Sequence, residues 1–131
     1  EQGLVVVWLG SDAERDLNRR LARTVGVDAT AVFGLTELVV LGGHARFVLG
    51  NDSGPMHVLS LAGVPVSALF GPTDWRRSHA LGQQNNVLYN PVECSPCHLP
   101  VCPPQRAHAC LAGLSPEVVL ARIEANGLLA P

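Results

Sequence analysis

The chain has 131 residues, of which 47% are hydrophobic and 15% are charged, and its formal net charge is −2 with His neutral. This composition is typical of a folded protein with a buried core and argues against intrinsic disorder. The sequence shows no basic stripe of the kind that nucleic-acid-binding proteins carry. Its apolar stretches are too short to span a bilayer, and its first residues lack the features of a signal peptide. We expect one domain that starts abruptly, as a segment of a longer protein would.

The first part of the chain alternates predicted strands and helices. The apolar run at residues 4–10 is typical of a strand that is buried on both faces of a parallel sheet. The next segment predicts a helix, with Ser11 or Asp12 as N-cap, Glu14 in the first turn and Gly26 as its end. The elements predicted to follow are a strand over 29–34, a helix over 35–45 and a strand over 46–50.

The alternation continues to the end of the chain. Pro55 at a first helical position and Gly63 beyond the end predict a helix over 55–63. The remaining predicted elements are strands over 64–71 and 86–89 and a C-terminal helix over 116–127 that Ser115 caps. Strands and helices that alternate in this way form βαβ units. We therefore predict an α/β fold, a Rossmann-like parallel sheet with helices on both faces.

Polar residues gather in the segment "GNDSGPMH" at residues 50–57, where a predicted strand leads into a helix. Ligands of open parallel sheets bind beyond the carboxyl ends of the strands. The amides of a first helical turn have no intrahelical partners, so the turn after Ser53 and Gly54 can hold a phosphate. Asp52 would repel a phosphate but suits hydroxyl groups, and His57 can face the same anion as a donor. The pattern indicates a phosphate that is bound next to a sugar.

The same residues also have an ordinary structural explanation. Asp, Ser and Gly are common N-cap residues, and Pro is common at the position that follows. A Gly-Pro turn explains "GPTD" at residues 71–74 without any ligand. Glu14 suits the positive end of its helix for electrostatic reasons alone. The local pattern therefore leaves both a helix cap and a ligand site open.

A longer match distinguishes between these alternatives. The segment "NDSGPMHVLSLAGVPVSALFGPTD", residues 51–74, resembles the signature segment of glycosyltransferase family nine, the bacterial heptosyltransferases of the lipopolysaccharide inner core. The resemblance continues upstream in "VVVWLGSDAERD" and downstream in "CSPCHLPVCPPQRAHACLAGLSPEVVL", a cysteine-bearing tail that is found in one branch of the family. It covers nearly the whole chain.

The resemblance implies a fold, an activity and partners. Family members have the GT-B fold, in which two Rossmann-like domains face a cleft. This chain resembles the C-terminal domain only, so residues 1–131 would form a single domain, truncated at its start, that binds the nucleotide-sugar donor ADP-heptose. The lipopolysaccharide core acceptor would be held by an N-terminal domain that this sequence lacks. The enzyme would be cytoplasmic, at the inner face of the inner membrane, and the isolated chain would be inactive.

The resemblance also implies residue roles, all toward the nucleotide sugar and none catalytic. These are Asp52 on the sugar, the amides of Ser53 and Gly54 on the diphosphate, His57 beside it, Glu14 on the ribose hydroxyls, and Thr73 and Asp74 in a loop near the donor. The chain departs from the family at "FGLTEL". Leu35 directly follows Gly34 here, whereas family members usually have further residues between the two. That stretch lies where the base would be read, so the identity of the base stays open.

All four cysteines lie between residues 94 and 110, at Cys94, Cys97, Cys102 and Cys110. The Cys-x2-Cys spacing is compatible with a tetrahedral zinc, but the later spacings do not match a standard finger or ribbon. A cytoplasmic protein keeps its thiols reduced, although disulfides can form on oxidation. The alternatives are reduced thiols, a zinc site and disulfides, and we assign no metal ligand and no cofactor. A second functional hypothesis is a non-enzymatic βα module whose zinc-binding cysteine flap is an interaction surface.

Overall fold

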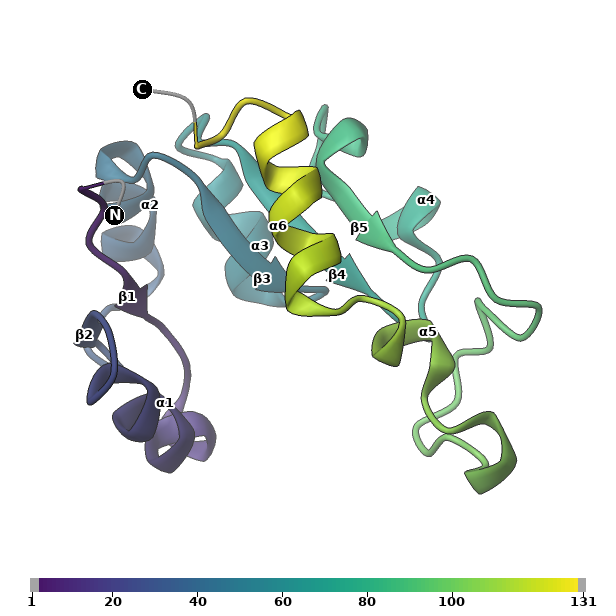
Figure 1. The fold of residues 1–131 in the computed structure, drawn as a ribbon. Helices are drawn as coiled ribbons and strands as arrows, with labels where there is room; N and C mark the ends of the chain where they lie inside the picture. Colours follow the sequence, from purple (N-terminus) through teal and green to yellow (C-terminus); the bar gives the residue numbers. More distant parts are fainter. Residues whose placement is uncertain (1–2, 130–131) are drawn as a thin grey trace. The chain divides into compact units, whose positions relative to one another are not determined.

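The structure, a computed structural model, describes residues 3–129. The chain divides into two compact units, Glu1–Leu38 and Val39–Pro131 (Figure 1). Each unit contains a parallel sheet: β1 pairs with β2 in the first, and β3, β4 and β5 pair in that order in the second. Among the described residues, no helix is long and apolar enough to cross a membrane.

The first unit is built around two short parallel strands. Its elements are β1 (Val7–Trp8), the 3-10 turn η1 (Asp12–Glu14), α1 (Arg15–Ala22) and β2 (Val27–Asp28). Val7 pairs with Val27 in the parallel register. Gly26 has a φ of +87°, and a Cβ at this position would lie 2.3 Å from the carbonyl oxygen of Val6. Only glycine therefore permits the chain to enter β2 this close to β1.

A buried polar network fixes the carboxyl ends of these two strands. Asn18 of α1 donates from Nδ2 to the hydroxyl of Thr30 at 2.9 Å and lies 3.2 Å from the carbonyl oxygen of Leu9. Thr30 donates its hydroxyl to Asp28 Oδ1 at 2.6 Å, and the same oxygen accepts the Thr30 amide at 3.0 Å. The Thr30 hydrogen bonds lower the pKa of Asp28 below its ordinary value. This network ties α1 to the turn after β2.

The predicted strand over 29–34 was wrong, because the strand is Val27–Asp28 and the chain turns immediately after it. The turn follows from the two hydrogen bonds that Asp28 accepts from Thr30, which replace strand pairing. Ala31 then takes a left-handed φ of 55°. The helix predicted over 35–45 is present as α2 (Leu35–His44), and it runs from the first unit into the second.

The second unit consists of a three-stranded parallel sheet, β3–β4–β5, with helices on both of its faces (Figure 1). Leu49 pairs with Ser67, and Phe70 pairs with Tyr89. Its elements after α2 are β3 (Val48–Asn51), α3 (Gly54–Ser60), β4 (Val66–Phe70), α4 (Trp75–Ser78), η2 (Gln84–Asn86), β5 (Val87–Tyr89), η3 (Pro104–Arg106), α5 (Ala109–Ala112) and α6 (Pro116–Ala125).

Side chains alternate along the strands and so form two cores. One core joins Met56 of α3 to one face of β4 through Val66, Ala68 and Phe70. The other packs Leu88 of β5 against α6, whose Val119 and Ile123 are buried with it, and Figure 1 shows α3 and α6 on opposite sides of the sheet. The α/β fold with parallel strands and helices on both faces is therefore confirmed for this unit.

Candidate functional site

The carboxyl ends of β3 and β4 bring six of the seven predicted site residues to one edge of the second unit. Asp52, Ser53, Gly54 and His57 follow β3 directly, in the turn that opens α3. Thr73 and Asp74 follow β4, which pairs with β3 in parallel. The seventh residue, Glu14, lies in the first unit.

The start of α3 is an open helix terminus. Ser53 is the N-cap and is extended, at φ −156° and ψ 162°, but its side chain accepts no hydrogen bond from the first turn. The Ser11, Asp74 and Ser115 side chains, in contrast, each cap their own helices. A Cβ placed on Gly54 would meet nothing within 4 Å. The side chain of Ser53 therefore caps no amide of the first turn, and the backbone at Gly54 is open to a ligand.

Asp52 lies between this turn and the segment that follows β4. Its amide donates to the carbonyl oxygen of Leu69 at 3.2 Å, which extends the β3–β4 pairing by one residue. The hydroxyl of Ser78 in α4 lies 3.5 Å from Asp52 Oδ2 and 3.3 Å from the carbonyl oxygen of Asp74. Asp52 is half-buried and His57 is exposed. The Ser78 hydroxyl, which has one hydrogen to donate, thus lies between two acceptors, the Asp52 carboxylate and the Asp74 carbonyl oxygen.

Asp74 organises a short stack of side chains in α4. Its Oδ1 accepts the amide of Arg76 at 3.1 Å and lies 3.6 Å from Arg76 Nη1. The Arg76 guanidinium lies 4.9 Å from the centre of the Trp75 ring, a cation–π contact. Trp75 stacks on Tyr89 of β5, with the ring centres 5.3 Å apart. Sequence reasoning missed both aromatic residues, although Trp75 and Arg76 directly follow the "GPTD" turn at residues 71–74.

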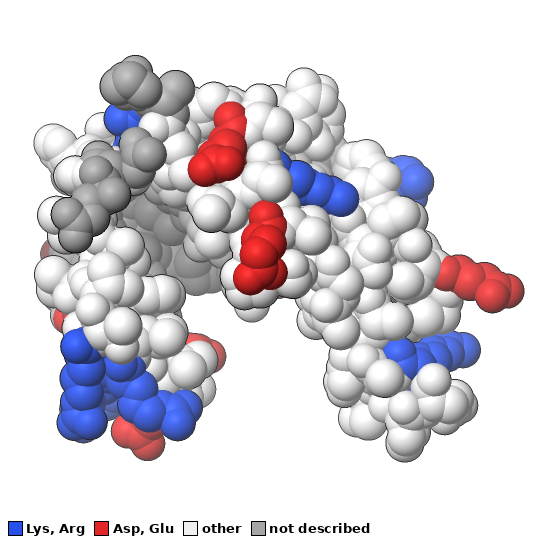
Figure 2. Space-filling view, viewed as in Figure 1, with Lys and Arg blue, Asp and Glu red and all other residues white. Residues whose placement is uncertain are grey.

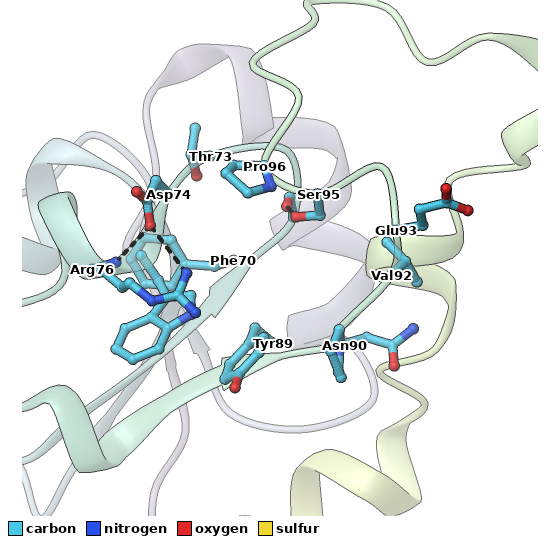
Figure 3. Close-up of a pocket in the computed structure, with 13 residues that line it drawn as sticks. Phe70, Thr73, Asp74, Arg76, Tyr89, Asn90, Val92, Glu93, Ser95 and Pro96 are labelled. Carbon is cyan, nitrogen blue, oxygen red and sulfur yellow. Dashed lines mark hydrogen bonds and ion pairs between the residues drawn. The ribbon is translucent and has the colours of Figure 1, made fainter.

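A hollow of about 360 Å³ opens beyond the ends of β4 and β5, and we call it the β4–β5 hollow. Figure 3 shows Asp74, Arg76, Ser95, Asn90 and Tyr89 arranged around it. Thr73 and Asp74, both predicted from the sequence, lie in its wall. The complete wall is Phe70, Gly71, Thr73, Asp74, Trp75, Arg76, Tyr89, Asn90, Pro91, Val92, Glu93, Ser95 and Pro96.

Glu14 is part of a capping box. Ser11 is the N-cap of η1, and Glu14 Oε2 accepts the Ser11 amide at 2.8 Å and the Ser11 hydroxyl at 2.5 Å. These hydrogen bonds, that of the side chain first, lower the pKa of Glu14 below its ordinary value. The carboxylate is therefore ionised at neutral pH and is held in one orientation at the carboxyl end of β1.

Charge is unevenly distributed in the molecule. All nine basic residues are arginines, and Figure 2 shows a compact group of them over α1, which carries Arg15, Arg19 and Arg20. The residues at the start of α3 include no arginine and no lysine. Within this segment, an anion at the helix terminus would therefore find its donors in main-chain amides and in the His57 ring.

The four cysteines line a second, smaller hollow of about 220 Å³ together with Arg106 and His108. All four are free thiols. Within residues 3–129, no three His, Cys, Asp or Glu side chains are grouped in a way that could hold a metal ion. The described part of the chain thus offers no support for a zinc-binding flap.

Comparison with known proteins gives one family. The family model described as glycosyltransferase family 9 (heptosyltransferase) matches residues 1–108. Two proteins named lipooligosaccharide heptosyltransferase 2, from Campylobacter jejuni serotypes O:6 and O:2, are 35% identical to the chain over 75 and 71 residues. These matches cover 56% and 53% of this chain but only 23% and 22% of the relatives, so the chain aligns with about a quarter of their length.

A solved structure supports the fold. The glycosyl transferase family 9 protein from Veillonella parvula DSM 2008 superposes with a TM-score of 0.70 at 24% sequence identity. The superposition covers 97% of this chain and 37% of that protein. At this identity the likeness establishes the fold alone, and it includes nearly all of the chain.

Proposed function

Because this chain belongs to glycosyltransferase family 9 (heptosyltransferase), we propose that it is the donor-binding part of an enzyme that transfers heptose from ADP-heptose to the lipopolysaccharide inner core. Residues 1–131 act as one nucleotide-sugar-binding domain, and residues 94–110 form a flap beside its β4–β5 hollow. The reaction belongs to a longer protein, which works in the cytoplasm at the inner face of the inner membrane. The acceptor is held mainly by the part of that protein that precedes this domain.

The observation that carries the proposal is the open start of α3 next to Asp52. The side chain of Ser53 leaves the amides of Gly54 and Met56 uncapped, and amides in this position bind phosphate oxygens. Asp52 lies directly before them, and its carboxylate can only accept hydrogen bonds when ionised. Hydroxyl groups of a sugar donate to such a carboxylate, whereas a second phosphate would be repelled. The pair therefore suits a diphosphate that carries a sugar.

The same geometry supplies part of the chemistry. In an inverting transfer, a hydroxyl of the acceptor attacks the anomeric carbon of the donor, and the bond from that carbon to the diphosphate oxygen breaks. Negative charge grows on the diphosphate as it leaves. The amides of Ser53 and Gly54, the first turn of α3 and a donor hydrogen of His57 stabilise this charge. We assign no general base to this chain, since a carboxylate on the preceding part of the protein takes the proton.

We also assign Glu14 to donor binding. Its pKa is lowered by the hydrogen bonds from Ser11, so the carboxylate is charged at neutral pH. Glu14 Oε2 already accepts two hydrogen bonds from Ser11, so Oε1 is the oxygen to which a ribose hydroxyl can donate. We assign Glu14 to the ribose, and Thr73 and Asp74 to the loop beside the donor sugar.

A titration tests the assignment of the helix terminus. The ¹⁵N-labelled chain is titrated with ADP and with ADP-heptose, and amide resonances are followed. We expect both ligands to shift the amides of Gly54 and Met56, and only ADP-heptose to shift Asp52 strongly. Binding is weak, because this chain contains only the donor side of the site. Gly43, an open glycine of α2, is the internal control. Equal small shifts at Gly43 and Gly54 at millimolar ADP would refute the proposal.

A further inference from the structure

We propose that the β4–β5 hollow binds a sugar ring of the acceptor, so that this domain holds both reactants. The inference rests on the proposed function and extends it to a second site. The wall of the hollow includes Thr73 and Asp74 but not Asp52, Ser53, Gly54 or His57. It is therefore a different space from the open terminus of α3.

The hollow has a preorganised wall. Trp75 stacks on Tyr89 at 5.3 Å and is covered by the Arg76 guanidinium at 4.9 Å. Trp75 and Tyr89 also pack against the buried core of the second unit. A wall that is already ordered costs little conformational entropy when a ligand binds. Tyr89 covers one face of the Trp75 ring and Arg76 covers the other, so the edge of this ordered stack forms the apolar side of the wall, in the way that binding sites combine apolar walls with a few polar groups.

The polar groups of the wall are balanced between donors and acceptors. Arg76 offers N–H donors and Asp74 offers carboxylate oxygens, and the two lie next to each other (Figure 3). Ser95 donates its hydroxyl to the carbonyl oxygen of Gly71 at 2.7 Å, which leaves its own oxygen free to accept. The Asn90 side chain turns toward Gly113 and donates one N–H to the carbonyl oxygen of Ala109 at 2.9 Å, which fixes the segment after β5 in the wall. A neutral ligand that both donates and accepts, such as a sugar, fits this set better than a phosphate.

The position of the hollow points to the acceptor. Ser78 lies within 3.5 Å of Asp52 Oδ2 and 3.3 Å of the Asp74 carbonyl oxygen. One hydroxyl thus separates the residue that we assign to the donor sugar from the wall of the hollow. Transfer requires the attacking hydroxyl to lie about 3–3.5 Å from the anomeric carbon. We assign the acceptor sugar to the hollow because Asp52 and Asp74, a residue of its wall, both lie next to the Ser78 hydroxyl.

The test uses a methyl heptopyranoside as probe and the ¹⁵N-labelled 131-residue chain. We expect a Kd on the order of 1 mM, as befits a ligand with few atoms. The indole N–H of Trp75 and the amide of Asn90 shift, and the indole of Trp8, in the other unit, does not. Arg76→Ala raises the Kd about tenfold, whereas Arg77→Ala, the matched change at an exposed arginine of the same helix outside the wall, leaves it unchanged.

Competition distinguishes the possible ligands. We expect the glycoside to have the same Kd in the presence of ADP as in the presence of ADP-heptose. Each nucleotide is added at ten times its own Kd. Displacement by ADP-heptose but not by ADP would mean that the hollow takes the donor sugar, and the inference would be wrong. Loss of ADP affinity in Arg76→Ala would assign Arg76 to the diphosphate and also overturn it. Absence of glycoside binding alongside normal ADP binding would refute this inference and leave the proposed function standing. Glycoside binding without any ADP binding would refute the proposed function instead.

Discussion

Asp52 is the residue that distinguishes a nucleotide sugar from a bare nucleotide in this proposal. Asp52→Asn keeps the size of the side chain and its contact with Ser78 but removes the charge that sugar hydroxyls donate to. We expect the Kd for ADP-heptose to rise about 10- to 100-fold, since hydrogen bonds to charged groups contribute about 1.5–3 kcal/mol. The Kd for ADP stays the same or falls slightly, because a like charge beside the diphosphate is removed. Calorimetry with both ligands measures the two Kd values. Equal losses of affinity for ADP and for ADP-heptose would show that Asp52 has only a structural role.

Thr30 is the central residue of the buried network in the first unit. Its hydroxyl accepts from Asn18 and donates to Asp28, and its side chain is only 3% exposed. Thr30→Val keeps the shape and leaves buried polar groups without a partner, so we expect a loss of about 1–3 kcal/mol in the stability of this unit. Urea unfolding followed at the Trp8 indole resonance measures it. Thr24→Val, at an exposed turn position, is the control and changes little.

The helix start at Ser11 makes the stability of the first unit depend on pH. The pKa of Glu14 is lowered by the hydrogen bonds from Ser11, and the pKa of Asp28 by those from Thr30. A lowered folded-state pKa means that the stabilisation is complete above the unfolded-state pKa and is lost as pH falls through the folded-state value. We therefore expect the Trp8 resonance to report loss of stability below about pH 4. Ser11→Ala should reduce this dependence, and an unchanged pH profile in that variant would contradict the assignment.

Two adjacent glycines of α2 allow the effect of packing on stability to be measured apart from the effect of helix propensity. A Cβ on Gly42 would lie 3.0 Å from the carbonyl oxygen of Leu59 and 3.1 Å from the Ala62 Cβ, whereas a Cβ on Gly43 would meet nothing within 4 Å. Both changes to alanine gain helix propensity of about 0.5–1 kcal/mol. Only Gly42→Ala also overpacks α2 against α3, at a cost of about 1–3 kcal/mol. We expect Gly43→Ala to raise the thermal midpoint and Gly42→Ala to lower it.

The sequence predicted helix starts well where a cap signal was present, and it failed at a turn made by a single side chain and at contacts between distant segments. Ser115, with Pro116 after it, marked the start of α6, because a cap and the residue after it are neighbours in the chain. The second strand was misplaced because one carboxylate, Asp28, folds the chain back two residues later. The Trp75–Tyr89 stack was not predictable from either segment alone. It exists because β4 and β5 pair in a register that sets Phe70 against Tyr89, and no local pattern encodes that register.

At the scale of the whole molecule, the candidate site is spread over turns that separate strands bring together. The residue types at the ends of β3 and β4 predict a ligand site from the sequence alone, because functional residues of parallel sheets lie beyond their carboxyl ends. The β4–β5 hollow required the structure, since its wall combines the turn after β4 with the segment after β5. The roles of Glu14, Asp52 and His57 remain predictions that the titrations above test.

The chain aligns with less than a quarter of the length of its heptosyltransferase relatives. A transfer reaction needs the donor, the acceptor and a base held together, and we assign only donor contacts and one acceptor subsite to these residues. We expect the 131-residue chain to bind ADP and to release none from ADP-heptose in the presence of a heptose-bearing acceptor. A full-length family member under the same conditions is the positive control. Turnover by the chain alone would show that it contains the base, and its carboxylates at Asp52, Asp74 and Glu93 would then be the first to replace.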